Sequence, residues 1–592
     1  MLKRVLSRLL SGLRRSGGSA GNLQHARESW PLMSQVIEAF NNKDHHRVVS
    51  LCRETLRDDP GHAQANHVCG RALIELGRGA EAEPLLRAAL EAEPDLAEAH
   101  ADLSRVLRQS GDPAGAEQHG RRAVELAPAE PRYRLVLADV FDEAGRHAES
   151  LEQVSLAQEY APEQIDVLQR LILKLDHVGQ YDAALRIAER AMRELGPRFE
   201  THHFLGYARF STGDHEGAVA ACREAIRLNG KSPGIMVTLG SALLALGRAD
   251  EAMAAYRRAL KVLPTYPDAL FHQGMLNLMR GRYRDGWAGF EYRFKIPRGT
   301  KRRAEPRWNG TSLRGRTLHV LREQGLGDDI MYSSCYPQLI ADAKHCVIEC
   351  EPRLEKLFRR SFPQAEFVPI VDNAIKSEVL ERKDVDARIF SASVPVYLRN
   401  SLRDFPEHQG YLFADPARAA YWRGQLARLG PGLKVGLSWR GGTVYTHRNR
   451  RTLLLETLQP LLAIPGVHWV NLQYGERAGE IAAFSAAHGI AITDWPEAID
   501  GDYDETAALV DGLDLVVSVC TSVIHLTGAL GREARVMVPF APEWRYGLEG
   551  DRMPWYPGVH LHRQVDPQDW SSVIAEVAAA LKARLAVSGL KI

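Results

Sequence analysis

Two short segments carry residue types that can bind an anionic ligand. Gln-Gly-Leu-Gly-Asp at 324–328 follows an apolar run at 317–321 and precedes a helical pattern. Glycine lets backbone N–H groups approach a ligand, and a helix N-terminus favours negative charge. Cys-Thr-Ser at 520–522 stands in the same kind of place, so its hydroxyls and free N–H groups can accept a diphosphate. The alternative role for Asp328, Thr521 and Ser522 is helix capping.

One histidine lies beside the second segment. His525 falls one turn into the helical pattern that begins at 521, on the face that a bound phosphate or sugar would touch. A single histidine in an apolar helix is also a common packed core residue. The sequence leaves both interpretations open.

Apolar runs that alternate with helical patterns position these segments. The runs predict strands of a parallel sheet joined by right-handed crossovers, and such sheets bind ligands at the carboxyl ends of their strands. The motifs fall at those ends. Besides 317–321, the runs are 434–439, 468–473, 513–519 and 534–539.

The first half of the chain repeats itself every 34 residues. The ladder consists of Gly77, Gly111, Gly145, Gly179, Gly213, Gly247 and Gly281, with Pro60, Pro94, Pro128, Pro162 and Pro264 and with Ala82, Ala116, Ala184, Ala218 and Ala252 at the same period. Glycine permits the turn between two helices, alanine lets the helices approach, and proline ends the second helix. The unit is therefore a helix pair.

The period and spacing resemble the tetratricopeptide repeat (TPR), over residues 27–296 as about eight units. This resemblance implies an α-solenoid, a superhelix whose concave face holds a protein partner. A scaffold or dimerisation role is the alternative. Aromatic residues at 283, 287, 290 and 294 lie on one helical face, and we expect them to pack the last helix against the second half of the chain.

Composition excludes several classes of protein. A net charge of +1 gives no overall attraction to nucleic acid, and no apolar run reaches the 18 residues of a membrane span. Seven scattered cysteines favour a reducing cytoplasm, with Cys346 and Cys350 as strand residues rather than metal ligands. Residues 1–26 form a basic, flexible leader without the apolar core of an export signal. The leader is either frayed or in weak contact with an anionic membrane surface.

The second half resembles the glycosyltransferase domain that many bacteria join to TPRs, which is similar in turn to the heptosyltransferases. The matching pieces are 324–328, Gly-Leu-Ser-Trp 436–439, Leu-Gln-Tyr-Gly 472–475, Thr-Ala-Ala-Leu 506–509, His-Leu-Thr-Gly-Ala-Leu-Gly 525–531 and Pro-Trp-Tyr-Pro 554–557. The resemblance implies the α/β GT-B fold of two Rossmann-like domains. After a linker at 297–316, 317–430 would be the acceptor-side domain and 431–592 the nucleotide-sugar domain. The last helix, about 568–586, would pack back across the cleft.

The same resemblance assigns roles to residues. It implies that Asp328 is the general base that takes a proton from the acceptor hydroxyl, in a glycine loop with Gln324, Gly325 and Gly327. The donor would be bound by Trp439, Arg440, Gly441, Arg451, Gln473, Tyr474, Thr521, Ser522 and His525. Among Arg440, Arg448, Arg450 and Arg451, the last best matches the basic position of the family, and no metal or other cofactor is implied. Cys520 replaces an aspartate common in relatives and is expected to close a buried strand.

The leading hypothesis is transfer of a sugar from a nucleotide-sugar to a protein recruited by the repeats, with flagellin Ser/Thr as the acceptor that the family implies. One alternative is a heptosyltransferase-like enzyme of lipopolysaccharide or surface glycan assembly. The other is a non-catalytic TPR interaction scaffold. The sugar, the nucleotide base and the stereochemical outcome are left open by the sequence.

Overall fold

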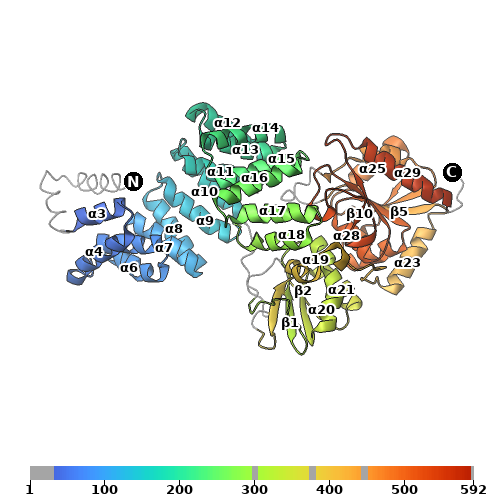
Figure 1. Cartoon of the computed structure of the whole chain (residues 1–592), viewed down its shortest axis with the longest axis horizontal. Helices are drawn as coiled ribbons and strands as arrows, with labels where there is room; N and C mark the ends of the chain where they lie inside the picture. The colour runs from blue at the N-terminus through green and yellow to red at the C-terminus, as the bar shows by residue number, and fades with distance from the viewer. Residues whose placement is uncertain (1–31, 297–304, 372–381, 442–450, 588–592) are drawn as a thin grey trace. The chain divides into compact units, whose positions relative to one another are not determined.

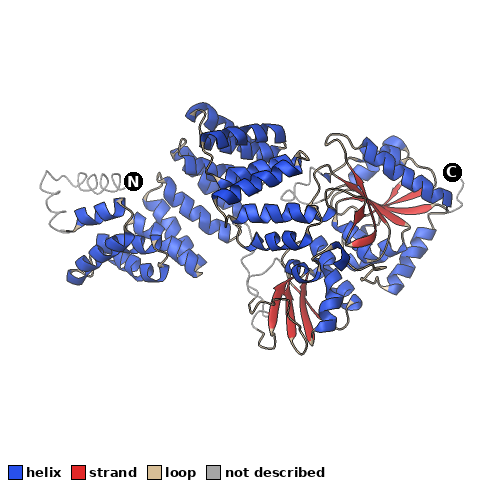
Figure 2. Ribbon diagram, in the orientation of Figure 1, coloured by secondary structure: helices blue, strands red, loops and turns tan. Residues whose placement is uncertain are grey.

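The computed structural model describes residues 32–296, 305–371, 382–441 and 451–587. The chain divides into two compact units, Met1–Ala208 and Arg209–Ile592. The predicted leader at 1–26 and two of the predicted cationic residues, Arg448 and Arg450, lie outside the described residues. Figure 2 shows helices in both units and the strands of two sheets in the second unit.

Paired helices fill the first unit (Figure 1). They are α3 (Met33–Asn41), α4 (His45–Asp58), α5 (Ala63–Glu75), α6 (Gly79–Ala92), α7 (Ala97–Ser110), α8 (Pro113–Leu126), α9 (Pro131–Glu143), α10 (His147–Tyr160), α11 (Ile165–His177) and α12 (Tyr181–Leu195), and α13 (Phe199–Thr212) runs past residue 208. The second unit continues the pattern with α14 (His215–Leu228), α15 (Pro233–Ala245), α16 (Ala249–Val262), α17 (Pro267–Met279) and α18 (Tyr283–Phe290), followed by the 3₁₀ turn η1 (Glu291–Phe294).

The predicted ladders have the predicted geometry. All seven glycines of the 34-residue ladder have positive φ, from 69° to 92°, a conformation that disfavours other residues. The five ladder alanines are fully buried between helices. Each ladder proline stands two residues after the end of a helix, as Pro60 does after Asp58. The predicted helix pairs are therefore confirmed.

The first of two sheets in the second unit is parallel, in the order β3-β2-β1-β4. Its strands are β1 (Thr317–Leu321), β2 (His345–Cys350), β3 (Glu366–Pro369) and β4 (Ala387–Phe390). Short helices connect them: α19 (Leu326–Tyr332), η2 (Ser333–Cys335), α20 (Tyr336–Asp342), η3 (Pro352–Leu354) and α21 (Glu355–Ser361), with η5 (Ser391–Ser393), α22 (Pro395–Leu398) and η6 (Leu402–Asp404) after β4. Cys346 and Cys350 lie in β2, as predicted.

The second sheet has the order β10-β11-β9-β8-β5-β6-β7, with only the β10–β11 pair antiparallel. The strands are β5 (Leu433–Ser438), β6 (Val467–Asn471), β7 (Ile492–Thr493), β8 (Leu515–Val519), β9 (Ala534–Val538), β10 (Arg552–Met553) and β11 (Tyr556–Arg563). The helices are α23 (Pro416–Ala427), α24 (Leu455–Leu462), α25 (Ala478–His488), α26 (Pro496–Ile499), α27 (Tyr503–Gly512), α28 (Ser522–Ala529) and α29 (Ser571–Val587), with η9 (Trp544–Tyr546) between β9 and β10.

The last helix does not pack across a cleft, so that expectation is wrong. The buried side of α29, with Val573, Val577 and Leu581, belongs to the same hydrophobic core as Val435 of β5 and Val517 of β8. Its apolar residues are buried against the sheet that precedes it in the chain.

Two predicted boundaries differ from the structure. Helix α23 lies within the range assigned to the first α/β domain, but it packs on α27, and the Trp422 indole donates to Glu505 Oε2 at 2.9 Å. The described part of the predicted linker is partly core, since Trp308 is buried and its backbone N–H donates to the Arg388 carbonyl at 2.8 Å. Helix α23 therefore belongs with the second sheet, because of the Trp422 contact. The first α/β domain begins before residue 317, because Trp308 is buried and pairs with β4.

No helix among the described residues is long and apolar enough to cross a membrane.

Candidate functional site

Both sheets reverse their strand order at one point. In the first sheet β2 and β4 flank β1, and in the second β6 and β8 flank β5. Loops that leave such a point diverge and open a crevice at the carboxyl ends of the strands. The glycine loop follows β1, residues 439–441 follow β5, and residues 520–521 follow β8. The predicted motifs therefore stand where this architecture binds ligands.

Asp328 has a capping contact and an ionic contact. Its Oδ2 accepts a hydrogen bond of 3.3 Å from the backbone N–H of Gly325, the N-cap residue of α19. Its Oδ1 forms an ion pair with the Arg545 guanidinium from the segment after β9. The capping interpretation is thus correct, but the carboxylate also reaches across to the second sheet's domain.

Gly327 lies against the start of α28. A Cβ at Gly327 would stand 3.1 Å from Cδ2 of His525 and 3.4 Å from Cα of Ser522. These contacts are tighter than most side chains accept, so glycine allows the two helix starts to approach. The glycine loop, with the partly exposed Gln324 and the exposed Gly325, is thereby beside the predicted diphosphate segment.

The hydroxyls of the predicted diphosphate segment are already bonded to side chains. Thr521 is the N-cap residue of α28 without a side-chain capping bond, and its Oγ1 lies 3.1 Å from Ser518 Oγ. Ser522 Oγ accepts a hydrogen bond of 3.0 Å from the Tyr503 hydroxyl. A ligand here would meet main-chain groups and the partly exposed Ser522 first.

His525 is buried, and its Nδ1 lies 3.1 Å from the Tyr556 hydroxyl. Burial lowers the pKa of His525 well below its ordinary value, and the charges of Arg545 and Arg451 lower it further. The ring is therefore neutral near pH 7. It is a packed residue next to the glycine loop, rather than a cation aimed at a ligand.

Three ion pairs in a row join four residues of the site. Arg451 pairs with Glu543, Glu543 pairs with Arg545, and Arg545 pairs with Asp328. Burial lowers the pKa of Arg451. Burial is also the largest single influence on Arg545, but Asp328, Tyr546 and Tyr332 together act against it and raise the pKa of Arg545. Sequence reasoning missed Glu543 and Arg545. The signal available was their place just after β9, a parallel strand beside β8.

Gln473, in the loop after β6, joins that loop to the loop after β5. Its Oε1 accepts hydrogen bonds from the backbone N–H groups of Trp439 at 3.2 Å and Arg440 at 2.8 Å. Glu480 accepts from the Trp439 indole at 3.0 Å and pairs with Arg440 at 2.8 Å. Trp439 and Gln473 therefore hold the loop together rather than present side chains to a ligand.

The remaining predicted donor residues differ in access. Tyr474 is 47% exposed. Gly441 is buried, and a Cβ there would stand 2.8 Å from the Cys520 carbonyl oxygen. Cys520 directly follows β8, and burial raises its pKa to about 12, so the sulfur stays a thiol. That state fits a residue that closes a strand.

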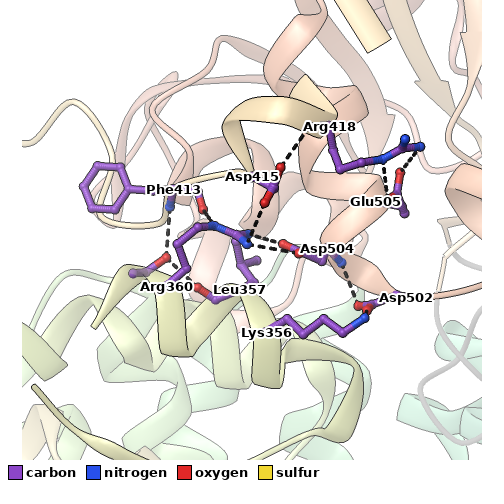
Figure 3. Close-up of polar contacts among 10 residues, drawn as sticks. Lys356, Leu357, Arg360, Phe413, Asp415, Arg418, Asp502, Asp504 and Glu505 are labelled. Carbon is purple, nitrogen blue, oxygen red and sulfur yellow. Dashed lines mark hydrogen bonds and ion pairs between the residues drawn. The ribbon is translucent and has the colours of Figure 1, made fainter. Parts of the chain in front are cut away.

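A second contact between the two α/β domains lies at α21 and α27 (Figure 3). We call Lys356, Arg360, Asp502 and Asp504 the charged bridge. Lys356 Nζ lies 2.7 Å from Asp502 Oδ2, and Arg360 pairs with Asp504 and donates to the Phe413 carbonyl at 2.8 Å. The bridge holds the two domains together through ion pairs.

Within the described ranges no group of three or more His, Cys, Asp or Glu side chains is arranged to hold a metal ion.

Comparison with known proteins identifies the repeats. Models of the tetratricopeptide repeat match residues 39–106, 97–122 and 237–285, and a model of anaphase-promoting complex, cyclosome, subunit 3 matches residues 177–259. The chain therefore contains tetratricopeptide repeats.

One relative has substantial sequence identity. Protein FlbA of Caulobacter vibrioides is 34% identical over 315 residues, which are 50% of this chain and 52% of that protein. The chain thus spans about half the length of this relative. Among solved structures, a tetratricopeptide repeat protein from Parabacteroides merdae covers 40% of this chain and 94% of its own, at 13% identity and a TM-score of 0.34. Yeast Tom70 covers 43% of this chain and 55% of its own, at 15% identity and a TM-score of 0.35.

Proposed function

We propose that the chain is a glycosyltransferase of the GT-B type that moves a sugar from a nucleotide-sugar to a protein held by its repeats. The observation that carries the proposal is the meeting of the glycine loop with α28, where Asp328, Arg545 and Arg451 are linked by charge. A carboxylate and two arginines where two α/β domains touch suit this reaction.

Asp328 is the proposed general base. A carboxylate can accept the proton of an acceptor hydroxyl while the oxygen attacks the anomeric carbon. The Oδ atoms already bind a backbone N–H and Arg545, so the side chain is held in one orientation at the start of α19. Fixed geometry of this kind is what general-base catalysis needs.

The arginines are proposed to stabilise the leaving nucleoside diphosphate. Arg451 and Arg545 share Glu543 as a counterion, and a diphosphate could replace that carboxylate as their partner. The half-exposed Tyr474 offers a face on which a nucleobase could stack. All three residues belong to the domain of the second sheet, so we propose that this domain binds the nucleotide-sugar.

The repeats are the proposed acceptor receptor. A row of TPR helix pairs presents a long surface for a protein ligand, which a lipid-linked or free sugar acceptor would not require. We propose a flagellin, glycosylated on Ser or Thr, as the protein acceptor, and a cytoplasmic site of action.

Two measurements test the proposal. Intact-mass spectrometry of flagellins from cells with and without this chain should show loss of a sugar mass, and Asp328→Asn should give the same loss. Asp285→Asn, a change at an exposed carboxylate of α18, is the matched control and should leave the modification in place. Unchanged flagellin mass in the absence of the chain would refute this acceptor. Full nucleotide-sugar turnover by Asp328→Asn would refute the proposed role of Asp328 as general base.

A further inference from the structure

The last repeat touches the segment that carries Arg545. Trp287 of α18 is fully buried, its indole N–H donates to the Arg399 carbonyl at 2.7 Å, and its ring meets Trp544 edge-on at 5.3 Å. Trp544 is the neighbour of Arg545 in η9. The predicted aromatic stripe thus packs against the site, as Phe294 also does on Phe390 of β4, at 5.1 Å.

Main-chain and glycine contacts hold the same segment from the repeat side. The Leu548 N–H donates to the carbonyl of Met279, the last residue of α17, at 3.0 Å. A Cβ at Gly247, in the turn between α15 and α16, would stand 2.9 Å from the Phe540 ring. Residues 540–548 are therefore bounded by repeat residues at both ends.

The last repeat also touches the glycine loop. Arg293 of η1 is buried, and its guanidinium binds Glu323 in a two-pronged pair, Nη2 to Oε1 at 2.7 Å and Nε to Oε2 at 3.1 Å. Nη2 further donates to Ser393 Oγ at 2.6 Å, in the turn after β4. Glu323 directly precedes 324–328, so Arg293 joins the start of the glycine loop to the turn after β4.

We infer that Trp287 and Arg293 are positioning residues for the proposed sugar transfer, so that the last repeat is a structural part of the active site. The inference rests on the proposed function. Arg293 holds the glycine loop that contains Asp328 in position, and Trp287 holds the segment that contains Arg545 in position. Because Asp328 and Arg545 pair with each other, the Arg293–Glu323 and Trp287–Trp544 contacts together determine the position of that ion pair. A bidentate arginine fixes direction as well as distance, and a shift of about 1 Å in such a group costs about 100-fold in rate.

The test uses the full chain with Arg293→Met, Arg293→Lys and the control Arg284→Met, a change at an exposed arginine of the preceding helix α18. Hydrogen–deuterium exchange is followed in a peptide over 323–332. Calorimetry uses UDP, GDP, CDP and ADP, and turnover is release of the nucleotide that binds from its sugar conjugate. A thermal melt identifies any variant that does not fold.

We expect Arg293→Met to raise exchange at 323–332 and to lower kcat about 10–100-fold, with nucleotide affinity within about threefold of wild type. Arg293→Lys should recover part of kcat, because lysine keeps the charge but not the fork. Arg284→Met should match wild type in all three measurements.

Failure of the inference and failure of the proposed function have different signatures. If wild type binds and turns over a nucleotide-sugar while Arg293→Met and Arg293→Lys equal Arg284→Met, then the positioning role is wrong and the function stands. If wild type neither binds a nucleoside diphosphate nor turns over a donor, then the proposed function is wrong and the inference falls with it. If Arg293→Met does not fold, a normal kcat in Arg293→Lys still overturns the inference.

Discussion

Two contacts between the α/β domains use the same chemistry in different surroundings. At the charged bridge, Lys356 is 72% exposed and meets Asp502 in contact with water, whereas the Arg360 and Asp504 side chains are 26% and 14% exposed. At the site, the Arg545 and Asp328 side chains are 13% and 19% exposed, and the Arg545 guanidinium lies over the Trp544 ring at 5.3 Å. Exposed ion pairs are weak and screened by salt, whereas breaking a buried pair leaves a charge without a partner or solvent. The Lys356–Asp502 pair should therefore contribute least to holding the domains together.

The largest expected difference is in catalysis. If Asp328 is the proposed general base, Asp328→Asn should lower donor turnover by about 10²–10⁴, the usual size of a general-base contribution. Asp504→Asn, the same change at the charged bridge, should alter turnover by less than about threefold, since it removes an ion pair away from the site. Steady-state release of nucleotide measures both. Equal losses in the two variants would mean that domain closure, not the base, limits the reaction.

The next difference is in stability. Arg545→Met should lower the free energy of unfolding by about 3–5 kcal/mol, because Asp328 and Glu543 would lose a buried partner. Lys356→Met, at the exposed end of the charged bridge, should lower the free energy of unfolding far less than Arg545→Met. Urea unfolding followed by tryptophan fluorescence compares the two variants. A loss at Lys356 as large as that at Arg545 would remove the distinction between the exposed and the covered ion pairs.

A pH effect should follow from His525. Its pKa in the folded chain lies well below the ordinary value, so the unfolded chain binds the extra proton as pH falls below about 6.5. Folding stability should then decrease toward low pH by up to about 1.4 kcal/mol per unit from this group. His525→Asn should remove that part of the slope in unfolding measured from pH 7.5 to 5. An unchanged slope would mean that the ring is hydrated and titrates normally.

The smallest effect is that of salt on the charged bridge. Lys356→Met should lower the free energy of unfolding slightly in low salt, and by less in 1 M NaCl, where the Debye length is about 3 Å. Arg545→Met should keep most of its cost in both conditions. If the loss of unfolding free energy in Lys356→Met did not depend on salt, the Lys356–Asp502 pair would behave like a buried ion pair.

Local patterns predicted what depends on local chemistry. Gly145 has the positive φ that a 34-residue ladder implies, and Leu515–Val519 is a strand because its apolar run is short and bounded. The place of Asp328 at a helix start after a strand was predictable because a glycine-rich turn at a strand end has a recognisable pattern. The sheet on which the last helix packs was not predictable, since apolar residues along a helix do not specify their partner.

Arg545 was missed for a different reason. It lies 217 residues from Asp328 in the chain, and such a pair follows from how two domains meet rather than from any spacing. Arg293 and Glu323 are only 30 residues apart, but the predicted linker separated them and suggested independence. Arg293, just before the predicted linker, pairs with Glu323, and Trp308, in its described part, donates its backbone N–H to the Arg388 carbonyl of β4.

The Trp287 contact also limits how the gene can change. Insertion or deletion of whole 34-residue steps upstream of Pro233 would lengthen or shorten the array without altering Gly247, Met279 or Trp287, which contact 540–548. The same event downstream would replace Gly247, Met279 or Trp287 and disturb that segment. Evolution and protein engineering can therefore exchange the early repeats as cassettes, whereas the last two must be inherited with the α/β domains as one piece.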